Sequence, residues 1–249
     1  MFIRTTNPVS HRLARMAFVM ACAAALIVAI AGPLHRYAGL EIEPAFALFR
    51  YGFYVAVAAV ALGLATILPT RPGDRRRGFV AAFLAVLVGA AAAYAPVTWF
   101  LRAQRSPELN DISTDISNPP PFVATLPLRR GASNAAAHPG AEAGALQRAA
   151  YSDIVPVTLP IPPAEAFKRA DAVAAAMGWD VIARAPREGR LEAVATTAWF
   201  GFRDDIVVRI RADGTGSRVD IRSKSRDGRS DLGVNARRIR AFIARLKEG

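Results

Sequence analysis

Three uncharged apolar runs in the first 101 residues constrain the fold more than any other feature of the sequence. They cover residues 16–34, 51–69 and 78–101. Each has close to the ~20 residues that an α-helix needs to cross the hydrocarbon core of a bilayer. A helix also satisfies its own backbone hydrogen bonds, as a spanning segment must. The sequence therefore predicts a transmembrane region of three helices in residues 1–101.

The charges between these runs predict their orientation. Arginines concentrate in the N-terminal tail and in the second loop, whereas the first loop carries both signs of charge. Basic short loops remain in the cytoplasm, so the N-terminus and the second loop are expected there, with everything after the third helix outside. The tail carries Arg4, Arg12 and Arg15, the second loop carries Arg71, Arg75, Arg76 and Arg77, and the first loop carries Arg36, Glu41 and Glu43, with Arg50 at the next membrane edge.

The first run has a second interpretation, as a secretory signal that is removed. Ala29-Ile30-Ala31 followed by Gly32 is a small-residue cleavage site, and a basic leader precedes the run. The length of the leader and Pro33 argue against cleavage, and both interpretations stay open. Either way, we expect a multi-pass protein of the bacterial cytoplasmic (inner) membrane whose C-terminal domain is periplasmic.

Cysteine and histidine are too scarce for the common catalytic and metal sites. The only cysteine, Cys22, lies in the first apolar run, and the histidines are His11, His35 and His138. A serine or cysteine nucleophile needs a neighbouring base, usually histidine. No phosphate-binding loop or zinc-protease motif occurs in the sequence. We therefore expect no catalytic residues, no metal and no cofactor.

The net charge of +12 predicts an anionic partner. Basic proteins bind nucleic acid or anionic lipid headgroups. The predicted side of the membrane, and the lack of aromatic residues among the basic ones, argue against nucleic acid. We expect membrane lipid as the partner, and a second envelope protein remains an alternative.

From residue 151 onward the hydrophobic pattern predicts a compact α+β domain that ends at residue 249, while residues 102–150 are expected to be a Pro-rich and Ala/Gly-rich connecting segment. Period-2 alternation predicts strands, and apolar stripes at helical spacing predict helices. The order is β-α-β-β-β-β-α, a mostly antiparallel sheet with two helices on one face, similar in outline to helix-grip folds. The expected segments are strands 154–159, 179–185, 190–199, 205–211 and 217–225, a helix over 162–177, and a last helix that Ser230 or Asp231 caps.

Trp199 is expected in the core of this domain, because alternation places it on the face of strand 190–199 that also carries Leu191 and Ala195. Leu232 is expected on the apolar stripe of the last helix, together with Ile239.

Four stretches form specific motifs. They are Asp111-Ile112-Ser113-Thr114-Asp115 with Asn118-Pro119-Pro120; Ala198-Trp199-Phe200-Gly201-Phe202 with Asp204-Asp205; Val219-Asp220-Ile221-Arg222-Ser223-Lys224-Ser225-Arg226; and Gly228-Arg229-Ser230-Asp231-Leu232-Gly233 with Asn235, Arg238 and Ile239. Together they resemble the bacterial domain-of-unknown-function family numbered 1499, over about residues 106–247. The resemblance implies a domain that often follows an N-terminal membrane segment, and it implies no reaction and no catalytic residues.

The candidate ligand site is the strand, turn and helix start near the C-terminus. A helix N-terminus offers free N–H groups and partial positive charge, which favour phosphate or carboxylate. Here five polar side chains could join it to bind an anion or another ligand. They are Arg222, Arg226, Ser230, Asn235 and Arg238.

The same residues also have an architectural explanation. Ser230 or Asp231 would cap the helix, and the arginines would pair with Asp204, Asp205 and Asp220. A buried Asn235 would need hydrogen-bond partners inside the domain. Asp204 and Asp205 are neighbours on a strand and should point to opposite faces, with Asp205 pairing to Arg209 and Arg211.

Two functions follow as hypotheses. The first is a non-catalytic, membrane-anchored envelope protein whose periplasmic domain binds a partner protein or a lipid-like or anionic ligand. The alternative is a hydrolase or transferase of unrecognised type that uses Asp204 or Asp205 with the Ser/Arg cluster. An apolar cavity between sheet and helix would favour a ligand, and carboxylates that converge on a cleft would favour the enzyme.

Overall fold

The computed structural model describes residues 8–70 and 76–248 and divides into two compact units. The helical unit contains the described residues up to Leu101 together with Ala198–Gly201. The α+β unit contains the described residues from Arg102 onward except for those four. The division matches the composition of the chain, because the apolar runs all fall in the first unit.

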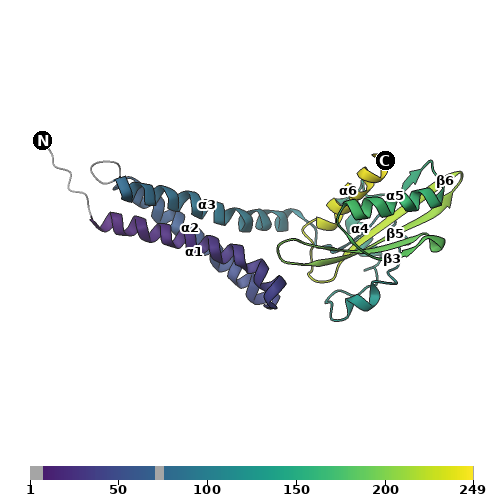
Figure 1. Cartoon of the computed structure of the whole chain (residues 1–249), viewed down its shortest axis with the longest axis horizontal. Helices are drawn as coiled ribbons and strands as arrows, with labels where there is room; N and C mark the ends of the chain where they lie inside the picture. The colour runs from purple at the N-terminus through teal and green to yellow at the C-terminus, as the bar shows by residue number, and fades with distance from the viewer. Residues whose placement is uncertain (1–7, 71–75, 249) are drawn as a thin grey trace. The chain divides into compact units, whose positions relative to one another are not determined.

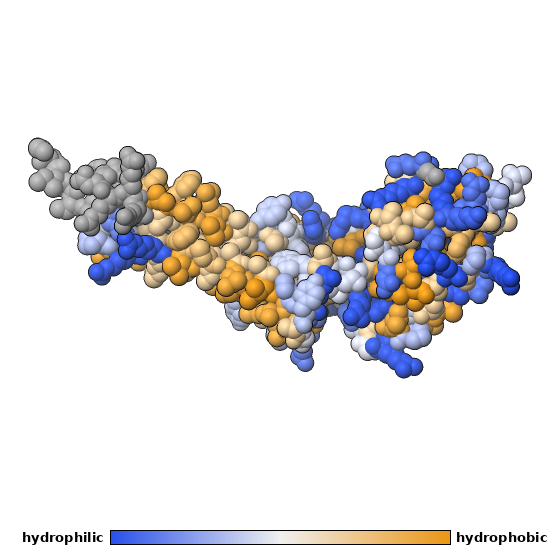
Figure 2. Space-filling model, viewed as in Figure 1, coloured by the Kyte–Doolittle hydropathy of each residue, from blue (hydrophilic) through white to orange (hydrophobic). Residues whose placement is uncertain are grey.

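The helical unit consists of α1 (Pro8–Ala38), α2 (Ile42–Ile67) and α3 (Arg76–Arg105, whose last residues extend beyond the unit). All three are long and apolar enough to cross a membrane, by length and composition. Figure 2 shows apolar residues over the surface of these helices. The three helices expected from the apolar runs are therefore confirmed, each longer than its run.

Small residues line the contacts between these helices, and large apolar residues point outward. Ala17, Ala59 and Ala85 are 0% exposed, whereas Leu26 and Leu64 are more than half exposed. Such an arrangement suits a lipid surrounding, where helices associate through close packing of small residues.

The first loop is shorter than expected. Because α1 continues to Ala38 and α2 begins at Ile42, Arg36 and Arg50 lie within helices. Polar residues at the end of an apolar run continue the helix until Gly39, whose φ of 70° ends it. Of the arginines that predict the orientation, Arg4, Arg71 and Arg75 lie outside the described residues, and the orientation stays a prediction.

The α+β unit contains an open, antiparallel sheet of six strands (Figure 1). The strand order is β1-β6-β5-β4-β3. β2 pairs with residues 217–219 of β6, on the same edge of β6 where β1 pairs with residues 222–224. The strands are β1 (Asp111–Ser113), β2 (Val157–Leu159), β3 (Asp180–Ala185), β4 (Arg190–Thr196), β5 (Arg203–Asp213) and β6 (Gly216–Ser225). The helices are α4 (Ala141–Ala150), α5 (Pro163–Ala176) and α6 (Val234–Glu248), and short 3-10 turns form η1 (Leu126–Arg129) and η2 (Pro186–Glu188). The predicted order from residue 151 and the α+β class are confirmed.

The hydrophobic core lies between one face of the sheet and helices α5 and α6. Figure 1 shows both helices on the same side of the sheet. Ile206 and Ile221 on the sheet and Phe242 on α6 are at most 1% exposed. Trp179 stacks on Phe242 with ring centroids 5.3 Å apart. Each such side chain contributes about 1.5–3 kcal/mol by burial.

Two details of the prediction are wrong. Trp199 does not belong to the domain core, because β4 ends at Thr196 and Trp199 groups with the helical unit. The strand stops there because Thr197 and Phe202 close the β4–β5 connection with two hydrogen bonds. Leu232 is not on the stripe of α6, since it precedes the helix with a φ of 53°, a left-handed conformation.

Residues 102–150, expected as a connecting segment, contribute several elements to the α+β unit. β1 pairs with the edge of β6. The free edge of β1 is covered in turn by Gln147 of α4, whose side chain accepts from Ser113 N at 3.0 Å and donates to Ser113 O at 2.7 Å. We call residues 114–140 the strap. It crosses the face of the sheet opposite to α5 and α6, as the contacts below establish.

Candidate functional site

The two faces of the sheet carry different chemistry because side chains alternate along β5 and β6. Ile206, Val208 and Ile221 face the helices and join the apolar core. Their neighbours Asp205, Arg222 and others face the strap, where charged side chains are buried. Four buried carboxylates lie on this strap face: Asp111, Asp205, Glu192 and Asp220.

Asp111 binds two cations of β6. Arg222 donates to both of its oxygens, at 2.8 and 2.7 Å, and Lys224 Nζ lies 2.9 Å from Oδ2. All three residues are at most 3% exposed. Burial alone would raise the pKa of Asp111, but Arg222 and Lys224 hold it below its usual range. Burial lowers the pKa of Lys224 in spite of Asp111.

The strap covers this ion pair with its carbonyl groups. Arg222 donates to Pro120 O at 3.1 Å and to Ala136 O at 2.9 Å, and Lys224 donates to Ala137 O at 2.9 Å. The guanidinium of Arg222 also lies 4.7 Å from the ring centre of Phe122. Arg222 is therefore fully engaged by protein groups.

Asp205 is 0% exposed and pairs with one arginine from each side. Arg226 donates to its Oδ1 at 2.7 Å, and Arg129 of the strap donates to Oδ2. Arg129 also donates to Asn134 O at 3.0 Å and Ser225 O at 3.2 Å. The pair thus ties the strap to the sheet.

Glu192 holds the strap by its backbone. The carboxylate, 0% exposed, accepts N–H groups from Val123, Ala124 and Thr125 at 2.9 to 3.1 Å, as well as the hydroxyl of Thr125. Arg190 pairs with it from the neighbouring position on the same face. Burial would raise the pKa of Glu192, but these N–H donors hold it below its usual range.

A second set of polar side chains lies on the opposite face, beneath α6. Arg238 donates to Asp204 Oδ2 at 2.6 Å and to Ser223 Oγ at 2.9 Å. Asn235 is 0% exposed, and its amide donates to Ser225 Oγ at 3.0 Å and to Asn110 O at 3.2 Å. The buried Asn235 thus has the internal partners that the sequence predicts.

Helix α6 is capped by the residues before it. Asp231 accepts from Gly233 N at 2.8 Å and from Asn235 N at 2.6 Å. Ser230 Oγ accepts from Leu232 N at 3.3 Å and donates to Pro107 O at 3.0 Å. Burial raises the pKa of Asp231 above its usual range, against the N–H groups of Asn235 and Gly233. The Asp231 carboxylate therefore already occupies N–H groups at the N-terminus of α6 that an anion would otherwise bind.

The structure does not bring the five candidate residues together. Arg222 and Arg226 lie on the strap face and Arg238 and Asn235 on the helix face, because the first two alternate with inward-facing residues of β6. Ser230 lies in the turn between β6 and α6. The arginines pair with buried carboxylates, as the architectural explanation expects.

Asp204 and Asp205 point to opposite faces, as predicted, and each is engaged by arginine. The predicted pairing of Asp205 with Arg209 and Arg211 is wrong. Residues four apart on a strand are roughly 13 Å apart, whereas cross-strand neighbours are about 5 Å apart. Arg209 and Arg211 instead pair with Asp220, at 2.8 and 3.1 Å.

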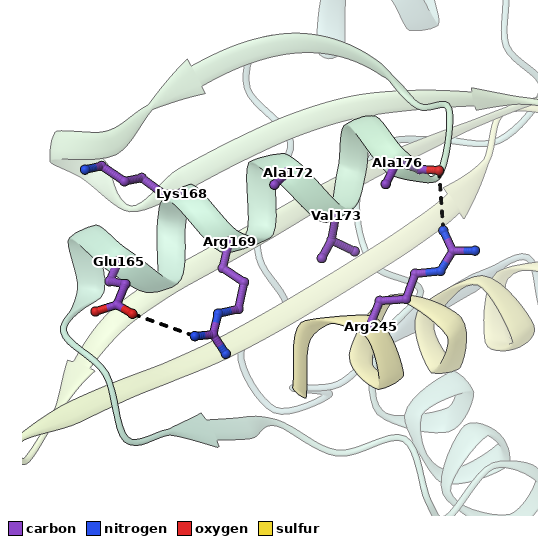
Figure 3. A pocket seen from close by; sticks show the side chains of 7 residues that line it. All are labelled: Glu165, Lys168, Arg169, Ala172, Val173, Ala176 and Arg245. Carbon is purple, nitrogen blue, oxygen red and sulfur yellow. Dashed lines mark hydrogen bonds and ion pairs between the residues drawn. The ribbon is translucent and has the colours of Figure 1, made fainter. Parts of the chain in front are cut away.

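Basic side chains with few partners lie elsewhere, on the outer surface of the two helices. An open groove of about 500 Å³ lies there, which we call the α5–α6 groove, and Figure 3 shows the side chains that line it. Lys168 and Arg169 of α5 and Arg245 of α6 give it positive charge. The residues that line it are Glu165, Lys168, Arg169, Ala172, Val173, Ala176 and Arg245. Sequence reasoning missed this site, because its residues come from two helices 69 or more positions apart and form no motif.

Among the described residues, no three His, Cys, Asp or Glu side chains gather as metal ligands would. The comparison with curated proteins gives no match. The family described as "Protein of unknown function (DUF1499)" matches residues 111–246, from the first residue of β1 to the last turn of α6. The match includes the strap and both helices of the groove, and it covers more than half of the 249 residues. The chain therefore belongs to the DUF1499 family.

Proposed function

We propose that the protein is a non-catalytic, membrane-anchored protein of the bacterial cell envelope whose α+β unit binds an anionic ligand outside the cytoplasm. One observation carries the proposal: Lys168 and Arg245 of the α5–α6 groove are exposed with few partners, whereas the cations near the buried carboxylates are engaged by protein groups. A domain that keeps positive charge at an open groove is suited to capture negative charge.

The catalytic alternative finds little support in the same geometry. A hydrolase or transferase that uses Asp204 or Asp205 needs a carboxylate able to reach a substrate. Asp204 is 3% exposed and pairs with Arg238, and Asp205 is 0% exposed between two arginines. Neither carboxylate lines the groove.

The location rests on helix length and on loop charge. A cytoplasmic N-terminus, which the loop charges favour, together with three crossings supports a periplasmic α+β unit. A reporter enzyme that works only outside the cytoplasm should be active when fused after Gly249 and silent when fused at Gly73. The opposite pattern would contradict the proposed location.

Native mass spectrometry of the full chain, purified from membranes in detergent, tests ligand binding. We expect an anionic lipid or another phosphate compound to remain bound at activation energies that remove zwitterionic lipid. A chain that keeps zwitterionic and anionic lipids equally well would contradict the proposed function. The bound mass would also identify the class of ligand.

A further inference from the structure

We propose that the α5–α6 groove binds the phosphate group of a lipid headgroup or of a soluble phosphate compound. The inference rests on the proposed function and deepens it, because it names the site and the chemical class. It depends on three observations: the charge of the groove, the freedom of its cations, and its floor.

The charge of the groove is positive on balance. Three cationic side chains line it, Lys168, Arg169 and Arg245, against the one carboxylate of Glu165. Arg169 Nη2 lies 3.7 Å from Glu165 Oε1, and the side chain of Glu165 is 58% exposed. Such an (i, i+4) pair on a helix surface, with Glu165 exposed and the Arg169 side chain 26% exposed, contributes only about 0.3–0.5 kcal/mol, so a bound anion can compete for Arg169.

The cations keep donors available for a ligand. Lys168 is exposed and has no ion-pair partner within the described parts of the chain. Arg245 NH1 donates to Ala176 O at 3.4 Å, a long hydrogen bond that leaves the rest of the guanidinium fork available (Figure 3). Arginine and lysine together suit phosphate, since a guanidinium binds two oxygens at once and an ammonium adds a point charge.

The floor of the groove consists of small, apolar side chains. Ala172 and Ala176 are exposed, and Val173 is 8% exposed between α5 and the core. Figure 3 shows Val173 pointing away from Lys168 on the same helix. The small alanine side chains leave room for a ligand. The volume of the groove, about 500 Å³, is within the range of roughly 300–1,000 Å³ for small-molecule sites. The open form suits a headgroup at the surface rather than an enclosed acyl chain.

Binding of two probes by the full chain in zwitterionic nanodiscs tests the proposal. The probes are short-chain phosphatidylglycerol below its micelle concentration and inorganic phosphate. The variant is Lys168→Ala with Arg245→Ala, and the matched control is Arg148→Ala with Arg187→Ala, two exposed arginines outside the groove. We expect at least a tenfold weaker binding of one or both probes by the groove variant, and unchanged binding by the control.

The two probes distinguish the sources of phosphate. If inorganic phosphate binds and displaces the lipid, the groove recognises the phosphate group alone. If only the lipid binds, the headgroup and its glycerol contact the groove. Equal binding by the groove variant and the wild type would overturn the assignment of the groove and leave the proposed function standing, whereas a wild type that binds neither probe would overturn both.

Ala172→Trp provides a second, independent variant. It fills the groove and leaves all three cations in place, so it separates a shaped site from general attraction to positive charge. We expect it to weaken lipid binding at least fivefold while the thermal unfolding of the chain stays the same. Unchanged binding in Ala172→Trp, or stronger binding of an acidic peptide than of both phosphate probes, would contradict a phosphate site in this groove.

Discussion

The two faces of one sheet are stabilised by different means. The helix face packs Ile206, Ile221 and Phe242 in an apolar core, where an apolar side chain of the right shape and volume would serve, apart from the polar set of Asp204, Asn235 and Arg238 beneath α6. The strap face buries Asp111, Asp205 and Glu192, each held by specific donors. Burying a charge is favourable only when its partners are in place, so the strap face depends on particular residues rather than on shape. The comparison teaches that arginines of this domain that pair with buried carboxylates stabilise the fold.

A large effect should come from breaking the strap face at Asp111. Asp111→Ala leaves Arg222 and Lys224 buried without their carboxylate, and we expect a loss of about 3–5 kcal/mol in the free energy of unfolding. Asp111→Asn keeps the shape and should still lose more than half of that amount. Denaturant unfolding of the α+β unit, followed by circular dichroism, measures both. An Asn variant as stable as the wild type would mean that shape alone matters on this face.

The helix face should respond in the opposite way to shape. Phe242→Ala opens a cavity under α6 and should lower the free energy of unfolding by about 3–5 kcal/mol. Phe242→Leu retains most of the volume and should lower it by about 1 kcal/mol. If the conservative change on this face were as costly as the truncation, the contrast between the two faces would be lost.

Acid should weaken the strap face first. The folded-state pKa values of Asp111 and Glu192 lie below their usual range, so both carboxylates stabilise the fold above the unfolded pKa, and this stability is lost as the pH falls through the folded pKa. Asp231 has the opposite sign, because its raised pKa favours the protonated form. We therefore expect the midpoint temperature of thermal unfolding to decrease when the pH is lowered below about 4.

The variant Asp111→Asn is the control for this pH dependence. It should reduce the acid sensitivity, while Asp231→Asn should leave it in place. A wild-type midpoint that stays constant from pH 7 to pH 3 would contradict the role given to the strap-face carboxylates.

The sequence predicts the parts of this structure that depend on periodicity. Alternation along β5 and β6 gives the strands and the opposite directions of Asp204 and Asp205, and helical spacing gives the burial of Asn235. Contacts with the strap could not be predicted, because Glu192 binds backbone N–H groups of residues about seventy positions away. A backbone N–H has no signature in the sequence.

The candidate site was predicted less well than the fold. A basic strand, turn and helix start looks the same in sequence whether its arginines are exposed or paired. What decides between the two is Asp111 and Arg129, which lie in the segment expected to be a connector. The α5–α6 groove lacked any local signal, because α5 and α6 meet only in the folded domain.

The most direct test compares one arginine from each region, Arg226 on the strap face and Arg245 in the α5–α6 groove. The chain has three tryptophans. In a background of Trp99→Phe and Trp199→Phe, the fluorescence of Trp179 reports unfolding of the α+β core alone. We predict that Arg226→Ala lowers the free energy of unfolding by about 3–5 kcal/mol, because the buried Asp205 loses one of its two arginine partners, and that Arg245→Ala changes it by less than about 0.5 kcal/mol. Equal effects, or a larger loss for Arg245→Ala, would contradict the division between structural and available cations.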